Sequence, residues 1–326
     1  MNEHKDFNFI RERVVLSDTE KAEHRAALLS RMHATPMQPV PSPYTWTLFL
    51  NVRYAFVALL AVLVVSGSGV VVASEGAVPG SPFYGVKLTV NEPTRIALAR
   101  TPKEKAALEV AYAERRLKEF AAATVSNRLD ADTTKLIAAS LEDRLEGAEE
   151  NIDDLNTSGE GDDALEANSE LKGVLAAHAK ILRKVSAGDP VREVALAAIS
   201  EHIDQGIVET GAVEPVFAAS LESQESRGVL HASVSERQME VVEVLEDLRE
   251  DMVNASTTLD TGDHEELAES ITEVTGMLET ATREKDGGSA TRALKLYTEA
   301  DARIGELKAL IEAEQELGID LIGSEE

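Results

Sequence analysis

A run of twenty residues without a charged side chain interrupts the otherwise mixed pattern of polar and apolar positions. It extends from Tyr54 to Ala73 and reads YAFVALLAVLVVSGSGVVVA. At about 1.5 Å per residue, a helix of this length covers the roughly 30 Å hydrocarbon core of a bilayer. The alternative is a cleaved signal peptide, but this run is longer than the apolar region of such peptides and a long segment precedes it. We therefore predict one transmembrane helix over residues 54–73, in contact with the lipid bilayer.

The basic residues around this run indicate its orientation. Arg53 directly precedes the run, whereas the nearest basic residue beyond it is Lys87. Basic residues close to a membrane span favour the cytoplasmic side. We expect a single-pass protein of the bacterial cytoplasmic membrane with its N-terminus in the cytoplasm and its C-terminal domain outside.

From residue 130 onward, apolar residues recur at steps of four and three, which is typical of amphipathic helices. The seams comprise Leu141, Leu145, Ala148, Ile152 and Leu155; Leu171, Leu175, His178, Leu182 and Val185; Val241, Leu245, Leu248 and Met252; Leu267, Ile271, Val274 and Leu278; and Ala293, Tyr297, Ala300, Ile304, Leu307 and Ile311. Breaks are predicted at residues 156–163, 188–190, 211–215, 261–263 and 287–288. Short breaks favour antiparallel neighbours. We expect an all-α fold, with one transmembrane helix plus an extended or bundled set of antiparallel amphipathic helices.

These patterns divide the chain into five parts. They are a short cytoplasmic helical head (1–35), a Pro-rich tether and interfacial segment (36–53), the transmembrane helix (54–73), a juxtamembrane helical region (74–130) and an acidic helical bundle (131–326). Within the last part, the residues around Leu141 and Leu155 are echoed by those around Leu245 and Leu259. This echo indicates two related helical hairpins or a coincidence between acidic heptads, and it leaves open whether the helices form one bundle or two.

The head contains one predicted helix with a thin apolar patch. Residues 17–20 read Ser-Asp-Thr-Glu, a capping box that predicts a helix from about Asp18 to His33. Leu28, Leu29 and Met32 form the apolar patch, which is too small to make a core by itself. We expect this patch to bind a protein partner or to lie near the membrane.

A short head before a single span resembles the architecture of membrane-bound anti-sigma factors, which hold a transcription factor at the membrane. The resemblance is architectural only. The zinc-binding class of those proteins uses a His and two Cys, and here the head histidines His4, His24 and His33 have no cysteine to join them. The resemblance implies a cytoplasmic regulator as the partner, and no zinc.

Two motifs follow the predicted span in fixed order. The first contains Pro79, Gly80, Pro82, Phe83, Tyr84 and Lys87. The second is Ala-Glu-Arg-Arg-Leu at 113–117, with Arg115 and Arg116 beside a seam of Ala106, Val110, Ala113, Leu117 and Phe120. Residues 101–104 (Thr-Pro-Lys-Glu) form a second capping box that opens this helix. We expect the two arginines to pair with neighbouring acids.

These motifs and the preceding span resemble the bacterial family catalogued as domain of unknown function 5667. That family has a membrane helix followed by a Pro-Gly-x-Pro-Phe/Leu-Tyr-x-x-Lys pattern and an Ala-Glu-Arg-Arg-Leu helix. The resemblance implies a membrane-anchored, exported helical domain of a bacterial protein. It implies no activity.

Composition narrows the function classes. The 326 residues include 59 acidic and 32 basic side chains, a net charge of −27, with 43% hydrophobic residues. The hydrophobic share is sufficient for a packed core. The acidity disfavours a nucleic-acid partner, because such proteins need a basic face to neutralise phosphates. With no cysteine, thiol catalysis and Cys-ligated metals are excluded.

Two acidic turns have oxygen ligands that a metal could use. Residues 154–165 begin like a calcium loop, but the twelfth position is Leu165 where a bidentate glutamate is needed. The second turn has Asp260, Asp263, His264, Glu265 and Glu266 at a helix start, where acids are favoured by the helix dipole. We predict no metal and no cofactor, although calcium at an acidic turn is left open.

No residues form a recognisable catalytic constellation. His178 falls on a helical seam, where a histidine is more often packed and hydrogen-bonded than reactive. The sequence has no phosphate-binding glycine loop, nucleophile elbow or zinc-binding His-Glu-x-x-His motif. We predict that the protein is not an enzyme. The leading hypothesis is an interaction or sensing module of the envelope, anti-sigma-like in its head. The alternative is a structural spacer or a self-associating assembly protein.

Overall fold

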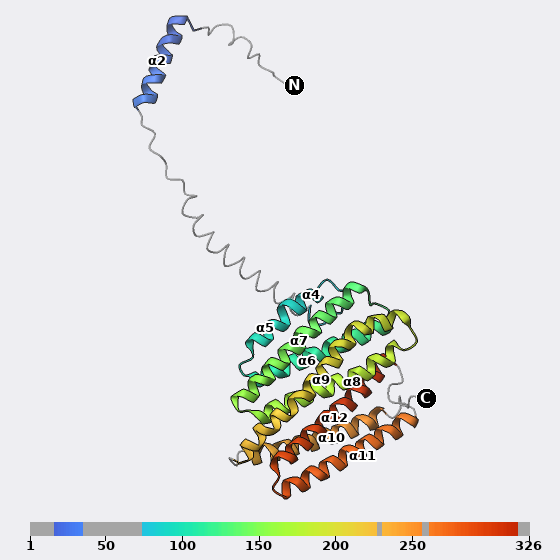
Figure 1. Ribbon diagram of the computed structural model, residues 1–326. Helices are drawn as coiled ribbons and strands as arrows, with labels where there is room; N and C mark the ends of the chain where they lie inside the picture. The colour runs from blue at the N-terminus through green and yellow to red at the C-terminus, as the bar shows by residue number, and fades with distance from the viewer. Residues whose placement is uncertain (1–15, 35–73, 227–229, 256–260, 319–326) are drawn as a thin grey trace, which may run out of the picture. The chain divides into compact units, whose positions relative to one another are not determined.

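A computed structural model describes residues 16–34, 74–226, 230–255 and 261–318. Every regular element in these ranges is helical (Figure 1), which confirms the all-α class. The elements are α2 (Asp18–Ala34), α4 (Tyr84–Val86), the π-helix η1 (Lys87–Asn91), α5 (Glu92–Leu98), α6 (Pro102–Val125), α7 (Ala131–Ser158), α8 (Gly161–Ser186), α9 (Pro190–Ser226), α10 (Leu230–Ala255), α11 (Thr261–Asp286) and α12 (Ala290–Leu317). Helix α2 belongs to one unit and α4 to α12 to another.

The predicted transmembrane helix at 54–73 and the tether at 36–53 lie outside the described residues. Within the described ranges, no helix is both long and apolar enough to cross a membrane.

The first predicted capping box is complete, and the second is formed in part. The Ser17 amide donates to the Glu20 carboxylate at 2.8 Å, and the Glu20 amide donates to Ser17 Oγ at 3.3 Å. At the start of α6 the Glu104 amide donates to Thr101 Oγ1 at 3.1 Å. The return bond differs from expectation, because the Glu104 carboxylate accepts from the amide of Arg100, one residue before the cap. Helices α2 and α6 therefore begin where the sequence predicts.

Helix α9 contradicts one predicted break. We expected the chain to turn at residues 211–215, but α9 runs unbroken through Pro215 to Ser226. A proline inside a helix removes one backbone hydrogen bond and costs about 3 kcal/mol. Phe217 and Leu221, two and six residues further on, are buried against the bundle. Because burying each such side chain contributes about 1.5–3 kcal/mol, packing offsets the cost of the proline.

The break predicted at 261–263 is also wrong, because these residues form the first turn of α11 (Thr261–Asp286). The breaks predicted at 156–163, 188–190 and 287–288 are confirmed. Helix α7 ends at Ser158, and Gly159 follows with φ of 86°. Helix α11 ends before the Gly287–Gly288 pair, where Gly288 has φ of 83°. Glycine adopts this left-handed conformation without the steric penalty of a Cβ atom, which explains its place after both helices.

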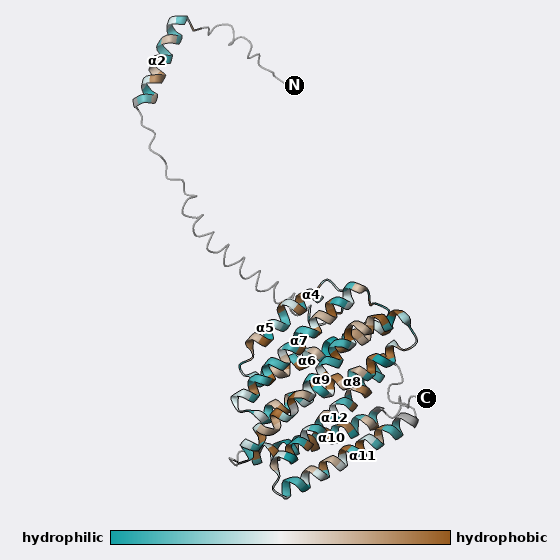
Figure 2. Ribbon diagram, viewed as in Figure 1, coloured by the Kyte–Doolittle hydropathy of each residue, from teal (hydrophilic) through white to brown (hydrophobic). Residues whose placement is uncertain are grey.

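The buried seams pack the helices into one array. Figure 1 shows α5 and α6 at one end, α11 at the other, and α8 and α12 between them. Nearly all of the predicted seam residues are buried, and Met252 is partly buried. Figure 2 shows hydrophobic and hydrophilic residues alternating along these helices, as expected for helices with one packed face.

The two helical pairs singled out as a repeat pack differently. Helices α7 and α8 contact each other directly, whereas α10 and α11 each pack mainly on α12. The segment joining α10 to α11, residues 256–260, lies outside the described residues, so the repeat stays a prediction.

Candidate functional site

The described chain resumes at Ser74, directly after the predicted span, and is fixed at once to the helical array. The Ser74 side chain is fully buried and accepts a hydrogen bond at 2.7 Å from the Asn91 amide. Ala77 is also buried, and its carbonyl accepts from the Lys87 ammonium at 3.2 Å. The first residues after the predicted span are therefore held against η1.

Elements α4, η1 and α5 form one helical segment from Tyr84 to Leu98. Its middle turn is widened, because the Glu92 amide bonds to the carbonyl of Lys87, five residues earlier. Pro93 follows and has no amide proton to donate, so the regular pattern is already broken at this point. Tyr84, Lys87 and Asn91, spaced by three and four residues, are all buried on one face.

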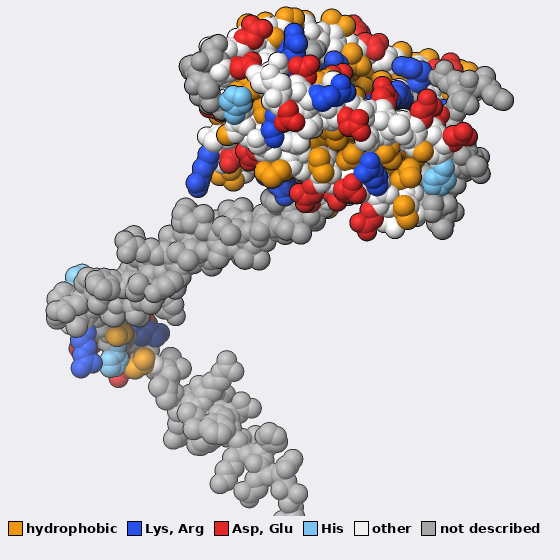
Figure 3. Space-filling view, turned by 90° about the horizontal axis from the view of Figure 1, so that it is seen from below, with side chains coloured by type: hydrophobic (Ala, Val, Ile, Leu, Met, Phe, Trp, Pro, Cys, Tyr) orange, Lys and Arg blue, Asp and Glu red, His pale blue; other side chains and the backbone are white. Residues whose placement is uncertain are grey.

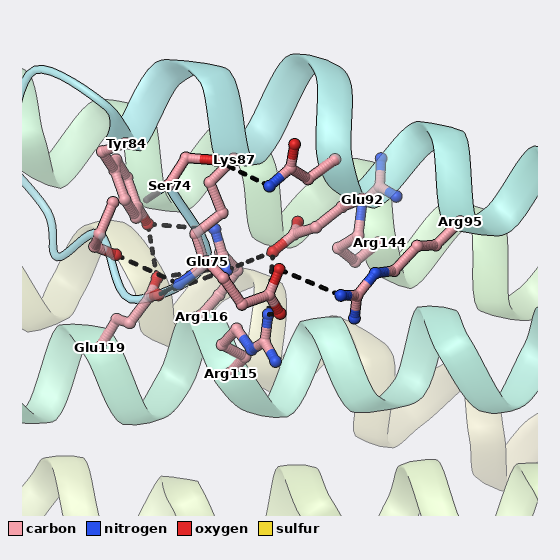
Figure 4. A network of polar contacts seen from close by, with 12 residues as sticks. Ser74, Glu75, Tyr84, Lys87, Glu92, Arg95, Arg115, Arg116, Glu119 and Arg144 are labelled. Atoms are coloured by element: carbon pink, nitrogen blue, oxygen red, sulfur yellow. Dashed lines mark hydrogen bonds and ion pairs between the residues drawn. The ribbon is translucent and has the colours of Figure 1, made fainter. Parts of the chain in front are cut away.

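Lys87 and Tyr84 share one acceptor on α6 (Figure 4). The Lys87 ammonium lies 2.5 Å from Glu119 Oε1, and the Tyr84 hydroxyl donates to Glu119 Oε2 at 2.6 Å. Both oxygens of the Glu119 carboxylate are thus engaged by the residues of the first motif. This arrangement joins the motif after the span to α6.

Arg116 lies at the centre of the same cluster and is fully buried. Its Nη2 atom donates to Glu92 Oε1 at 2.8 Å, and its Nε atom lies 3.3 Å from Glu119 Oε2. Its Nη1 atom donates to the Tyr84 hydroxyl at 3.2 Å, and its guanidinium lies 5.4 Å from the Tyr84 ring centroid. The planar guanidinium, with five donors, can bond to these partners at once.

Arg115 and Arg95 extend the cluster toward solvent. Arg115 lies 3.4 Å from Glu75 and 3.7 Å from Glu92, and Arg95 lies 3.2 Å from Glu75. These pairs are partly exposed, so each contributes little to stability by itself. They nevertheless join Glu75, close after the predicted span, to both α5 and α6.

Burial governs the protonation of this cluster. Burial raises the pKa of Glu92, and the charges of Arg116 and Arg115 oppose that rise. Burial also raises the pKa of Tyr84, with the Glu119 charge adding to the effect and Arg116 opposing it. The tyrosine therefore stays a neutral donor. The cluster pairs cations with carboxylates and positions no side chain as a nucleophile or a general base, which suits it to fixing helices together.

Residues 76–205 match the family model described as Domain of unknown function (DUF5667). The resemblance seen in the two motifs is confirmed over a much longer stretch. The match covers α4 to α8 and the first part of α9. Neither the curated proteins nor the solved structures contain a match to the chain.

Within this DUF5667 segment, the structure separates the motif residues into two groups. Tyr84, Lys87, Arg115 and Arg116 meet in the cluster described above. Pro79 and Gly80 form the turn before α4, where Gly80 has φ of 82°. Pro82 and Phe83 have exposed side chains, and the carbonyl of Phe83 accepts a hydrogen bond from the Lys87 amide at 3.1 Å. The first motif thus combines a turn with two anchoring side chains.

Sequence reasoning missed the acidic half of this cluster. Glu92 and Glu119 complete it, and neither was singled out. A signal exists, because Glu119 lies three residues after Arg116 on α6 and thus on the same face. In the sequence, however, a buried polar face has the same pattern as a solvent-exposed one.

The remaining candidate sites do not assemble. Asp154, Asn156 and Ser158 all lie on the last turns of α7, so the segment that begins like a calcium loop is helical there. In the part of the chain that the structure describes, no three His, Asp or Glu side chains are arranged to hold a metal ion. His178 is buried, with Nδ1 2.9 Å from the carbonyl of Val174. Asp260 lies outside the described residues.

In α2, the predicted patch is exposed. Leu28, Leu29 and Met32 are 63%, 46% and 72% exposed. The binding of a partner by this patch stays a prediction.

Proposed function

We propose that the chain is a non-catalytic, single-pass membrane protein of the bacterial envelope. Residues 54–73 span the cytoplasmic membrane, α2 lies in the cytoplasm, and the helical array lies outside as an interaction or sensing domain. The head acts as an anti-sigma-like element that engages a cytoplasmic regulator. The observation that carries the proposal is the tight attachment of Ser74, the first residue after the charge-free run, to the array.

That attachment matters because it removes any flexible linker on the far side of the span. Ser74 and Ala77 are buried, and Glu75 pairs with Arg95 and Arg115. A force or a ligand that moves the array would therefore move the end of the span with it. A purely passive tether would not need such a joint.

The surface next to this joint suits a lipid interface. The segment from Val78 to Arg100 exposes Val78, Phe83, Val90 and Leu98. Its exposed charges are Arg95 and Arg100, since Lys87 and Glu92 are buried. Apolar side chains flanked by arginines favour the surface of a membrane with anionic lipids.

Membrane topology can be tested directly because the chain has no cysteine. Single cysteines at Met239 of α10, which is 69% exposed, and at Ser30 of α2 would report the two sides. We expect a membrane-impermeant maleimide to label Met239→Cys in intact cells and Ser30→Cys only after the cells are opened. Labelling of Ser30→Cys alone in intact cells, or extraction of the full chain by alkaline carbonate, would refute the proposed topology.

The function of the head can be tested by capture of its partner. Changing Leu28, Leu29 and Met32 together to Glu should abolish recovery of a cytoplasmic protein that crosslinks to the wild-type head. Ser30→Glu places a single glutamate on the opposite side of α2 and should leave recovery unchanged, whereas Leu28→Glu alone should already lower it. Equal recovery with the triple variant and with Ser30→Glu would remove the role proposed for the patch.

A further inference from the structure

The segment from Val78 to Arg100 inverts the usual distribution of polar and apolar side chains. Lys87, Asn91 and Glu92 are buried against the array, and Figure 4 shows Lys87 and Glu92 directed toward α6. Four large apolar side chains lie on the outside instead, between 44% and 73% exposed. They are Val78, Phe83, Val90 and Leu98. A helix on the surface of a soluble domain ordinarily buries its apolar side, so the outer side of this segment suits an apolar medium.

The outer side of the segment also lacks negative charge. The chain has 59 acidic residues, yet Glu92 is the only one between Glu75 and Arg100, and it is buried. By contrast, Figure 3 shows acidic and basic side chains interspersed among small apolar patches on the face that it draws. Arg95 lies 3.2 Å from Glu75, whereas the exposed Arg100 side chain forms no ion pair within the described ranges. Apolar groups beside a cation complement anionic lipid headgroups and the acyl chains beneath them.

The position of the segment favours a membrane over a protein as its cover. The Asn91 side-chain amide donates at 2.7 Å to Ser74, which directly follows the charge-free run. At about 1.5 Å per residue, Phe83 and Leu98 lie roughly 12 Å or less from Asn91 along the segment. A membrane crossed by residues 54–73 reaches all of this surface. A protein partner would have to share the surface with the lipid headgroups.

The attachment of Ser74 also explains why a small apolar surface is sufficient. A short amphipathic segment that is free in solution binds a membrane weakly. Here the span would hold the segment at the bilayer surface, so the contact forms within one molecule at a high effective concentration. No large interface is then needed.

We propose that residues 78–100 lie in the headgroup region of the leaflet on the side of the array, with their exposed apolar side chains toward the acyl chains and Arg100 against anionic headgroups. This inference rests on the proposed span and adds an orientation. Tyr84 contacts Glu119 and Glu92 contacts Arg116, so α6 runs antiparallel to the segment. Helix α6 therefore also lies parallel to the membrane plane.

The first experiment uses the full chain in vesicles of phosphatidylcholine with about a third phosphatidylglycerol. Because the chain has no cysteine, an environment-sensitive fluorophore can be attached at Leu98→Cys, with Met239→Cys on α10 as a control of similar exposure. We expect a lipid with a nitroxide near its headgroup to quench the fluorophore at position 98 at least about twofold more than at position 239. Equal quenching would overturn the proposal. So would a fluorophore at position 98 that is shielded from water but not quenched, because a protein would then cover the segment.

A second set of measurements tests the charge. Arg100→Glu should lower the quenching at position 98 toward the level at position 239, because it places a negative charge against anionic headgroups. Arg100→Lys keeps the positive charge and should leave the quenching unchanged. Vesicles of phosphatidylcholine alone should lower the quenching of the wild-type sequence at position 98 as well. Quenching that is the same in all of these cases would overturn the role of anionic lipid.

Failure of this inference can be distinguished from failure of the proposed span. A chain that resists extraction by alkaline carbonate, while position 98 is not quenched, keeps the span and refutes the lipid contact of residues 78–100. A chain that alkaline carbonate extracts refutes the span, on which the inference rests.

Discussion

Two interfaces of the array are built by opposite means. The segment from α4 to α5 is held on α6 by buried charges, with Arg116 between Glu92 and Glu119. Helix α12 is held on α10 and α11 mainly by apolar side chains such as Leu248, Val274 and Ile304. The first interface lies at the start of the DUF5667 segment, and the second lies wholly after it.

These two kinds of interface differ in how much their helices can shift against each other. Apolar surfaces of similar shape can slide or repack at small cost, so an apolar seam tolerates changes that conserve volume. A buried charge must find its partner at one distance and angle, or it remains unpaired at a large cost in free energy. The polar interface therefore fixes a single position for the chain where it leaves the predicted span.

The largest expected effect comes from removing the central cation. Arg116→Leu leaves the carboxylates of Glu92 and Glu119 buried with less compensation, and should lower the free energy of unfolding by about 3–5 kcal/mol. Urea denaturation followed by circular dichroism measures this. Arg116→Lys keeps the charge but loses the fork of donors, and should lower the free energy by about 1–3 kcal/mol. If both variants were as stable as the wild type, the polar interface would have no special role.

A substitution that removes volume from the apolar interface should lower the free energy of unfolding by nearly as much. Leu248 is fully buried on α10, and changing it to Ala should lower the free energy of unfolding by about 2–5 kcal/mol. Leu248→Met keeps the volume and should lower it by less than about 1.5 kcal/mol. The same urea titration tests both variants. A Leu248→Met variant that loses more stability than Arg116→Lys would contradict the contrast between the two interfaces.

The crossing of α8 and α12 joins the DUF5667 segment to the helices after it. A Cβ atom added to Gly173 would lie 2.8 Å from the carbonyl oxygen of Ala302, and backbone cannot move aside cheaply. We expect Gly173→Ala to destabilise the protein by about 1–3 kcal/mol through this clash. Gly276→Ala on α11 is the control, because its Cβ atom would meet open space. Equal thermal midpoints for the two variants would contradict a close crossing.

The smallest effect is a pH dependence at the contact of α7 and α9. Glu149 and Glu209 face each other in a cavity of about 440 Å³ that Glu142, Glu146, Glu201 and His202 also line. Burial, followed by the contact with Glu209, raises the pKa of Glu149 to about 8, and the contact with Glu149 lowers the pKa of Glu209. The two carboxyl groups thus share a proton.

The sign of the effect follows from proton binding. Between the ordinary pKa of 4.5 and about 8, folded Glu149 binds more protons than the unfolded chain, so stability falls as pH rises through this range. Glu149→Gln should remove much of this fall and raise the thermal midpoint at pH 8 but hardly at pH 5. Burial raises the pKa of Glu109 to about 7, so a smaller fall of stability with rising pH should remain in Glu149→Gln. The exposed neighbour Glu150→Gln is the control, and a wild-type midpoint that rises from pH 5 to pH 8 would contradict the prediction.

The sequence by itself determined most of the helices and their buried faces, because apolar steps of three and four report a helix and its packed side together. It also identified Tyr84, Lys87, Arg115 and Arg116 as motif residues. The tertiary structure decided what they do, since only packing brings Glu92 and Glu119 within reach of them. It also decided that α9 continues through Pro215, because the burial of Phe217 and Leu221 outweighs a local preference to break. Helix propensity depends on neighbouring residues. By contrast, distant residues along the chain decide how a buried charge is paired and whether packing compensates for a poor helix former.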